Sequence, residues 1–487
     1  MVTLCRAFPI QKEVLYRWLL AIAAAKVIWF VLFIALRSNA WTEHATAGHI
    51  ALQPKESFGY YQPIESWIHD GHYGGMCHMP GLLPFYAPLR FILPETMALQ
   101  AMVVLQVFFD IFATWTLGML AARIFQSMRA MHLTFLLACL STFTAVRNNY
   151  LLSDSLCISI TILSLFSFSS FAIDRSYRHI LLAGVGLCLA VLLRPAMLVV
   201  ISGVAFLILI VNGLSLRSLR YAALFVLPTI LAISGWTLRN KLTYGRTVVL
   251  LAPLGECQAQ ITPDFAAIRE WILASGGDYQ PWAAGGEAHW FFDSPAELPM
   301  PFEADDFTPG CDAAMLLSLK NDYHLLHSGA LSESDSLALE QSIIERGRLI
   351  RNSYITTHPL RYHVLNKIKF ARMILFPTRI DDLPFPAFQE MNIWQKIIKV
   401  CSLAALPVLS ALSLIALAVW LIRRKWVYVV WMCLPLGLVL AHSYIGFVEQ
   451  RYLAASYPFF LLLCAGFIAA GIDRFKATPQ KQAERLA

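Results

Sequence analysis

The sequence has few charged residues for its length. Only 14% of its 487 residues are Asp, Glu, Lys or Arg, and 58% are hydrophobic, whereas a soluble protein has about 25% charged residues. The hydrophobic residues gather in runs of about 18 or more, the length that crosses roughly 30 Å of hydrocarbon. This composition excludes an ordinary soluble enzyme and predicts an all-α polytopic membrane protein.

The sequence also lacks several motifs that would point to other classes of protein. It contains no CxxC pair, so no zinc or redox motif is indicated. It shows no internal repeat, which an inverted-repeat transporter would have, and no low-complexity segment. Its net charge of +7 does not indicate nucleic-acid binding, because the basic residues lie in short loops between apolar runs. Six of its ten cysteines lie inside those runs and are expected to be small core residues.

About ten transmembrane helices are predicted from the apolar runs. The loops that would face the cytoplasm are short and basic, which places both termini there by the positive-inside rule. We therefore expect an integral protein of the bacterial inner membrane. The expected spans are residues 14–36, 98–122, 130–146, 151–173, 179–193, 196–214, 220–238, 397–422, 426–444 and 452–472.

Three modules follow from this topology. Residues 1–238 form an N-terminal transmembrane module whose first extracytoplasmic loop spans 37–97, and residues 397–487 form a C-terminal transmembrane module with a basic cytoplasmic tail. Between them, residues 239–396 are expected to form a mixed extracytoplasmic domain. Its basic amphipathic segment, residues 359–376, is typical of a helix that meets anionic lipid at the membrane interface.

Within the predicted extracytoplasmic domain, residues 246–252 (RTVVLLA) favour a short strand, and the acidic, Gly- and Pro-rich stretch 255–312 favours a solvated surface of loops. The alternative for that stretch is a lid that binds an acceptor. A helix is expected to begin near Ser334 and Asp335 and to end before residues 358–359. Cys257 and Cys311 are expected to form a disulfide, with Cys77 able to displace either partner.

The stretch Lys55–Pro84 carries the densest chemistry in the chain. It combines carboxylates, tyrosines, three histidines and a Met-Pro-Gly turn directly after the first apolar run. We expect this stretch to form one wall of the active site.

Four arginines lie at the predicted outer surface, where the positive-inside rule disfavours them. They are Arg147, Arg194, Arg239 and Arg451. A charge at membrane depth costs a few kcal/mol unless it is paired. Either each arginine snorkels or pairs with a neighbour such as Asp154 or Glu449, or the group shares one anion, because the arginine fork suits phosphate. Asp154 could also cap its helix, and Asp110, inside the second predicted span, has no evident basic partner in the sequence.

Five short motifs appear in order along most of the chain, apart from residues 255–335. They are Glu56-Ser57-Phe58-Gly59-Tyr60 with Gly71 and Pro80-Gly81, Leu152-Ser153-Asp154-Ser155, Leu193-Arg194-Pro195, Trp236-Thr237-Leu238-Arg239-Asn240 with Tyr244-Gly245, and Glu449-Gln450-Arg451-Tyr452 with Pro458. Together they resemble the motifs of the GT-C membrane glycosyltransferases that use polyprenyl-phosphate sugars. The resemblance is to the branch of the protein O-mannosyltransferases and of the transferases that add aminoarabinose to lipid A.

The resemblance implies an inverting glycosyltransferase with a GT-C-like fold. Such an enzyme moves a sugar from polyprenyl phosphate to a lipid, glycan or protein acceptor on the outer face of the membrane. Glu56 stands where that family usually has an aspartate base, so Glu65 and Asp70 remain alternatives for the base. Arg194, Arg239 and Arg451 are the implied ligands of the donor phosphate. The supporting residues are Tyr60, Arg147, Asp154 and Glu449.

No metal site is predicted. A divalent metal could take part but is not required, because arginine can stabilise the departing phosphate equally well. The expected partners are the lipid-phosphate sugar donor, its acceptor and membrane lipids, with no nucleic acid. A polytopic transporter or lipid-linked glycan flippase is the alternative function, and a non-catalytic scaffold or a polymerase of the same fold is a third. The identity of the sugar, that of the acceptor and the oligomeric state do not follow from the sequence.

Overall fold

The computed structural model describes residues 5–37, 55–251, 262–278, 286–293, 300–302, 306–309, 311–378, 380, 383–446 and 450–486. Within these ranges, the side chains of residues 55–57, 211–212, 450 and 475–486 are not described. The chain folds into two compact units. Unit 1 comprises residues 1–251, 374–441 and 449–487, and unit 2 comprises residues 252–373 and 442–448.

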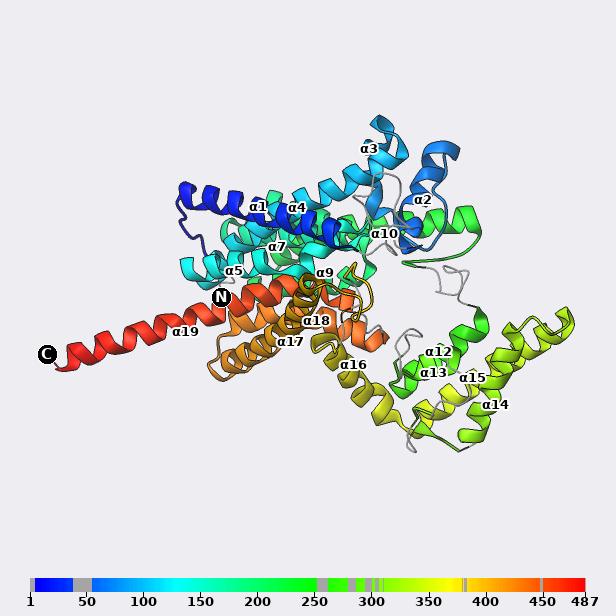
Figure 1. The fold of residues 1–487 in the computed structure, drawn as a ribbon. Helices are drawn as coiled ribbons and strands as arrows, with labels where there is room; N and C mark the ends of the chain where they lie inside the picture. The colour runs from blue at the N-terminus through cyan, green and yellow to red at the C-terminus, as the bar shows by residue number, and fades with distance from the viewer. Residues whose placement is uncertain are drawn as a thin grey trace. The chain divides into compact units, whose positions relative to one another are not determined.

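Unit 1 is a bundle of apolar helices, which confirms the predicted all-α membrane fold (Figure 1). In the described part of the chain, seven helices are long and apolar enough to cross a membrane. They are α1 (Lys12–Leu36), α4 (Glu95–Phe125), α7 (Asp154–Asp174), α10 (Leu216–Tyr244), α17 (Ile393–Ile422), α18 (Trp426–Ile445) and α19 (Tyr457–Leu486), the last with its apolar part ending at Arg474. The protein is therefore an integral membrane protein.

The remaining predicted spans also correspond to helices. The segment formed by α5 (Met128–Leu140) and α6 (Thr142–Ala145) with its following turn is bent by 57° and counts as an eighth span if it is one broken helix. Two further apolar helices, α8 (Tyr177–Leu193) and α9 (Leu198–Asn212), are shorter than a usual span. Each of the ten predicted apolar segments is thus helical, because every backbone N–H and C=O in hydrocarbon must be bonded within its own segment.

Helix α7 lies at the centre of unit 1, where it packs against α4 on one side and α8 on another. Its buried face carries small polar residues, including Ser159, Thr161 and Ser164. The hydroxyl of Thr161 donates to Cys157 O at 2.7 Å and that of Ser164 donates to Ile160 O at 2.7 Å, so these two hydroxyls are satisfied within the helix. The buried Ser159 hydroxyl has no hydrogen-bond partner among the described residues. Small residues of this kind let membrane helices approach closely.

The predicted active-site stretch 55–84 is largely helical. It forms α2 (Lys55–Asp70), a single 3₁₀ turn over Pro80–Leu82 and the beginning of α3 (Leu83–Ile92). Helix α2 packs against α3, and the 3₁₀ turn packs against α8. This arrangement brings the first loop to the end of the bundle where α8 ends and α7 begins.

Unit 2 consists of short helices around an aromatic core. These helices are α12 (Pro263–Ser275), α13 (Glu287–Phe292), α14 (Ala313–His327), α15 (Glu333–Thr357) and α16 (Asn366–Leu375). The core contains Trp271, Trp290, Phe291 and Phe302, all of them buried. The prediction of a solvated loop surface for 255–312 is therefore wrong in its described part, which supplies most of this core because its aromatic residues outweigh its acidic ones.

Two other predictions for the middle of the chain are tested. Helix α15 runs from Glu333 to Thr357 and is capped by the Ser332 hydroxyl, which accepts a hydrogen bond from Asp335 N at 3.3 Å. This confirms the predicted helix. The predicted strand 246–252 is absent from its described residues, 246–251. Here Asn240 donates to Val248 O at 3.1 Å and Trp236 donates to Leu250 O at 2.9 Å, so side chains take the places of strand partners.

The predicted disulfide between Cys257 and Cys311 is wrong. Cys311 is a buried free thiol whose neighbourhood is the aromatic core of unit 2. Cys77 is disulfide-bonded, which agrees with the alternative that Cys77 displaces one of the two predicted partners. Cys257 lies outside the described residues.

Candidate active site

The candidate site is built around an ion pair between Arg194 and Asp154. Asp154 is the first residue of α7, and Arg194 directly follows the last residue of α8. Because α7 and α8 are packed neighbours that run in opposite directions, these two ends meet. Arg194 Nη2 contacts Asp154 Oδ1, and the aspartate side chain is only 2% exposed.

Arg451 belongs to the same cluster. The guanidinium carbon of Arg451 lies 5.5 Å from the ring centroid of Tyr452, and that of Arg194 lies 5.7 Å from the same ring. Two cations on one tyrosine ring are held by its π electrons. The two guanidinium groups therefore lie in one cluster, as the shared-anion hypothesis requires.

A third arginine completes the positive charge around Asp154. Arg147, which is 2% exposed, comes from the turn after α6, and its guanidinium carbon lies 5.2 Å from the Phe143 ring centroid. The guanidinium groups of Arg194, Arg147 and Arg451 all interact electrostatically with the Asp154 carboxylate. Among the described residues, the cluster thus holds three positive charges and one negative charge.

Hydrogen-bonding capacity is also left over in this cluster. Within the described residues, Asp154 Oδ2 and Arg194 Nε are buried and have no hydrogen-bond partner. Leaving a buried charged group partly unsatisfied costs about 1–3 kcal/mol or more. The arrangement therefore has both the charge and the free N–H capacity to accept an anion.

Tyr60 brings α2 into contact with this cluster. The Tyr60 ring stacks on His78 with centroids 4.1 Å apart. Burial raises the pKa of Tyr60, an effect that the nearby Arg194 guanidinium partly offsets. The Tyr60 hydroxyl is therefore neutral at physiological pH and can donate a hydrogen bond to a bound ligand.

Two glycines allow these close contacts. A Cβ on Gly59 would lie 2.7 Å from His78 Nε2, so a side chain there would displace the ring that stacks on Tyr60. A Cβ on Gly81 would lie 2.3 Å from the backbone nitrogen of Leu193. The Pro80-Gly81 turn therefore lies directly against the end of α8, next to Arg194, which explains physically why that motif requires glycine.

The candidate bases are placed differently from one another. The backbone of Glu56 lies in α2, but its side chain is outside the described residues. The Glu65 carboxylate accepts hydrogen bonds from the Tyr86 hydroxyl at 2.5 Å and from Arg90 Nε at 3.0 Å, and Asp70 is exposed at the end of α2. Glu449 also lies outside the described residues.

Arg239 makes its contacts with the 73–75 segment of the first loop. Its Nη1 donates to Gly75 O at 2.8 Å and to Asn240 Oδ1 at 2.7 Å, and its Nη2 donates to Tyr73 O. It also stacks on Tyr244, with its guanidinium carbon 4.9 Å from the ring centroid. The structure thus joins Arg194 with Arg451 and shows Arg239 binding backbone carbonyls; a direct role of Arg239 in phosphate binding stays a prediction.

The sequence analysis missed a buried polar network that leads to this site. Lys26 of α1 lies 2.8 Å from Asp110 of α4, so the apparently isolated acid does have a basic partner. Asn148 Nδ2 donates to Asp110 Oδ2 at 2.7 Å, and Ser155 Oγ donates to Asn148 Oδ1 at 2.5 Å. Ser155 follows Asp154 directly. The signal was a lysine inside the first apolar run together with an aspartate inside the second.

Metal ligation has no clear candidate in the described part of the chain. No group of three or more His, Cys, Asp or Glu side chains there is arranged to hold a metal ion. The Glu56 and Glu449 side chains are outside the residues to which that statement applies.

Comparisons with known proteins add little to this description. No protein-family model matches the chain, and no curated protein matches it. Among solved structures, the chain is similar to the archaeal oligosaccharyltransferase AglB from Archaeoglobus fulgidus, described in complex with an inhibitory peptide and a dolichol-phosphate. The identity is 14% and the TM-score 0.44, over 96% of this chain and 52% of that one, so the chain spans about half the length of AglB. This similarity is too distant to assign an activity to the chain.

Proposed function

We propose that the protein is a membrane glycosyltransferase of the GT-C type, which transfers a sugar from a polyprenyl-phosphate donor to an acceptor hydroxyl. The observation that carries this proposal is the cluster of Arg147, Arg194 and Arg451 around the carboxylate of Asp154. Guanidinium groups suit the phosphate that leaves when the sugar is transferred, because arginine binds phosphate as a planar fork. The motifs that resemble the GT-C family provide Asp154, Arg194 and Arg451 of this cluster as well as the first-loop acid.

The proposed reaction is a single displacement with inversion. The acceptor oxygen attacks the anomeric carbon, and the bond between that carbon and the phosphate oxygen breaks, with its electron pair passing to the phosphate. The acceptor proton passes to a carboxylate, for which Glu56 is the proposed base. Arg194 and Arg451 stabilise the charge that develops on the leaving phosphate, since preorganised donors act most strongly where charge develops.

Asp154 and Tyr60 have supporting roles in this proposal. Asp154 is in contact with Arg194 Nη2, which holds the guanidinium group in place. The neutral Tyr60 hydroxyl can donate to the phosphate or to the sugar. A divalent metal is not needed for these steps, although one could share the charge stabilisation. We place the reaction at the outer face of a bacterial inner membrane, with both termini in the cytoplasm.

One observation favours the alternative function, a transporter or flippase. The Lys26–Asp110 pair lies within the membrane-spanning part of α1 and α4, and charged residues at that depth often mark translocation paths. Against this, the pair is enclosed: its side chains are 1% and 9% exposed. Asn148 and Thr114 also bond to the carboxylate, as expected for a structural pair.

Turnover by the purified full-length protein with a polyprenyl-phosphate sugar tests the proposal. Glu56→Gln should slow transfer by roughly 10²–10⁴-fold, the usual contribution of a positioned base. Glu95→Gln, which alters an exposed carboxylate at the start of α4, is the matched control and should leave the rate unchanged. If Glu56→Gln keeps more than about a tenth of the rate, Glu56 is not the base.

The acceptor class requires a separate measurement. Mass spectrometry of outer-face lipids, glycans and proteins, with and without the gene, identifies the modified molecule. A flippase would instead be favoured if the donor lipid accumulates on one side of the membrane and no sugar-free polyprenyl phosphate is formed.

A further inference from the structure

A basic pocket lies at the opposite end of unit 1 from the Asp154–Arg194 cluster. Arg123, near the last residue of α4, donates from Nη1 to Ser169 Oγ and Ser170 Oγ, both at 2.8 Å and both near the last residue of α7. Asp154, by contrast, is the first residue of that helix. The pocket is therefore at the predicted cytoplasmic end of the bundle.

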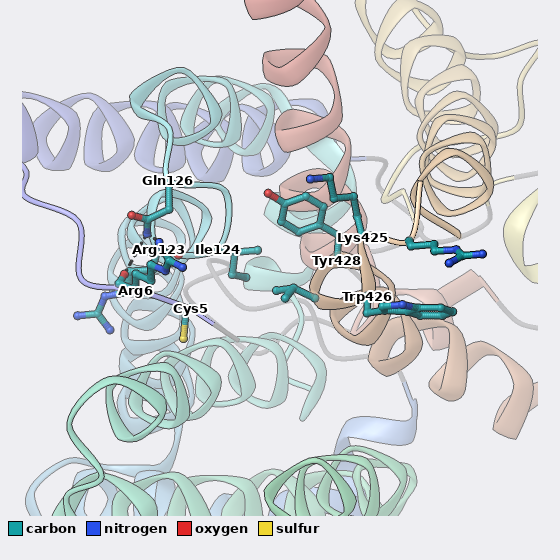
Figure 2. A pocket seen from close by; sticks show the side chains of 10 residues that line it. Cys5, Arg6, Arg123, Ile124, Gln126, Lys425, Trp426 and Tyr428 are labelled. Atoms are coloured by element: carbon teal, nitrogen blue, oxygen red, sulfur yellow. Dashed lines mark hydrogen bonds between the residues drawn. The ribbon is translucent and has the colours of Figure 1, made fainter. Parts of the chain in front are cut away.

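The pocket has two walls (Figure 2). Arg6, Arg123 and Gln126 lie on one side, and Lys425, Trp426 and Tyr428, from the connection between α17 and α18, lie on the other. Its volume is about 360 Å³, within the range of roughly 300–1,000 Å³ typical of small-ligand sites. It is therefore large enough to hold a phosphate with a small attached group.

The charge of this pocket has one sign. Among the residues that the structure describes, its lining includes four cations, Arg6, Arg123, Arg424 and Lys425, and no carboxylate. In the described part of the chain, none of these four forms an ion pair. Asp174 interacts electrostatically with Arg123, but its carboxylate contacts His179 Nδ1 at 2.8 Å. The Cys5 thiol adds no negative charge, because burial raises its pKa to about 12.

Neutral contacts hold these cations in position. Arg123 donates to the two serines, and its guanidinium carbon also lies 3.9 Å from the Phe166 ring centroid. Gln126 donates from Nε2 to Arg6 O at 3.1 Å and to Arg123 O at 2.9 Å, which fixes the first wall. The contacts that hold this wall are therefore neutral ones, made by serine, phenylalanine and glutamine side chains.

Apolar side chains beside the pocket favour a lipid over a free anion. Trp426, which lines the pocket, is 54% exposed, and Ile422, at the end of the adjoining α17, is 82% exposed. Tryptophan at the end of a membrane helix marks the level of the lipid head groups. Basic pockets between membrane helices on the cytoplasmic side bind the head groups of anionic lipids.

We infer that this pocket binds the phosphodiester head group of an anionic phospholipid, with the acyl chains lying along the end of α17. The phosphate contacts Arg123 at the base and Arg6 and Lys425 at the rim. The inference does not depend on the proposed transferase activity, since the pocket and the candidate active site lie at opposite ends of α7.

Native mass spectrometry of the purified full-length protein tests this inference, with short-chain phosphatidylglycerol as the probe and phosphatidylcholine of the same chain length as the neutral comparison. Phosphatidylglycerol should be retained at least about tenfold more tightly, since charge-assisted bonds to phosphate distinguish the two lipids. Equal retention of the two lipids overturns the inference.

Paired substitutions then locate the site. Arg6→Gln with Lys425→Gln should lower phosphatidylglycerol retention roughly tenfold or more. Arg178→Gln with Arg220→Gln removes the same charge from exposed residues that do not line the pocket, and should lower it by less than about threefold. Equal losses in both variants would mean that bulk charge, and not the pocket, attracts the lipid.

A second variant controls for misfolding, and a competition measurement distinguishes a lipid from a soluble anion. Arg424→Gln with Lys425→Gln replaces the first variant if that one fails to purify, and the same loss is expected. Inorganic phosphate at millimolar concentration should not displace the lipid, because it lacks acyl chains. Complete displacement would identify a site for a soluble anion and overturn the lipid assignment.

Discussion

Lys26 Nζ lies 2.8 Å from Asp110 Oδ2, and the lysine side chain is only 1% exposed. This ion pair joins α1 to α4 within the membrane-spanning part of the bundle. Through Asn148, which donates to Asp110 Oδ2 at 2.7 Å and accepts from Ser155 Oγ, it also supports the residue next to Asp154. The pair thus supports the start of α7 through two hydrogen bonds.

Replacing one partner of this pair should destabilise the protein more than replacing both. Lys26→Met leaves a buried carboxylate without its cation, which costs about 3–5 kcal/mol, whereas exchanging both partners for apolar residues is often close to neutral. We expect a lower melting temperature for Lys26→Met in detergent and substantial recovery in Lys26→Met with Asp110→Leu. A double variant that is as unstable as the two single losses combined would contradict this coupling.

Gly81→Ala should disturb the candidate site. The added methyl would lie 2.3 Å from Leu193 N, so the turn must move away from the residue that precedes Arg194. Overpacking of this kind typically costs about 1–3 kcal/mol, and transfer should fall at the same time.

Gly235→Ala is the control: nothing lies within 4 Å of its Cβ position in α10. That substitution should be neutral or stabilising by up to about 1 kcal/mol. Equal melting temperatures for the two variants would contradict the close contact at Gly81.

The helices could be predicted from the sequence because hydrocarbon leaves a spanning segment little choice of structure. Even α8 and α9, which are shorter than ordinary spans, lie within runs that the sequence identified. Helix α15 was also predictable, since Ser332 begins it as a local cap. These features depend on nearby residues alone, and so they follow from one sequence.

The pairing of charges could not be predicted, because it depends on which helices are neighbours and how each is rotated. Arg194 could pair with Asp154 or share an anion with Arg451, and the structure shows the first contact and brings Arg451 to the same ring, that of Tyr452. The sequence around Lys26 does not identify its partner, Asp110, which is 84 residues away in sequence. The aromatic core of unit 2 was missed for the same reason: its members are spread over residues whose acids suggested a solvated surface.

Thiol labelling should distinguish Cys77 from Cys311, two cysteines of the predicted extracytoplasmic regions. Cys311 is buried, and burial raises the pKa of its thiol to about 11, so the unreactive protonated form prevails at pH 8. We expect maleimide to label Cys311 only after denaturation, with no reductant needed, and to label Cys77 only after denaturation and reduction. Peptide mapping under non-reducing conditions is the measurement. A cross-linked peptide that contains Cys311 would contradict the structure.

Arg239→Lys distinguishes a loop-holding residue from a phosphate ligand. Arg239 donates to the carbonyls of Tyr73 and Gly75 from two different nitrogens, and one lysine nitrogen cannot reproduce that fork. If Arg239 holds the loop, hydrogen exchange over residues 72–78 should rise without any donor present, and transfer should fall as a consequence. If it binds the donor phosphate directly, the loop should exchange as before while the donor KM rises.

The control is Arg220→Lys, which alters an exposed arginine of the same helix and should change neither the exchange nor the donor KM. Because Arg239 donates to the carbonyls of both Tyr73 and Gly75, we expect the first result, and unchanged exchange over this loop would contradict it.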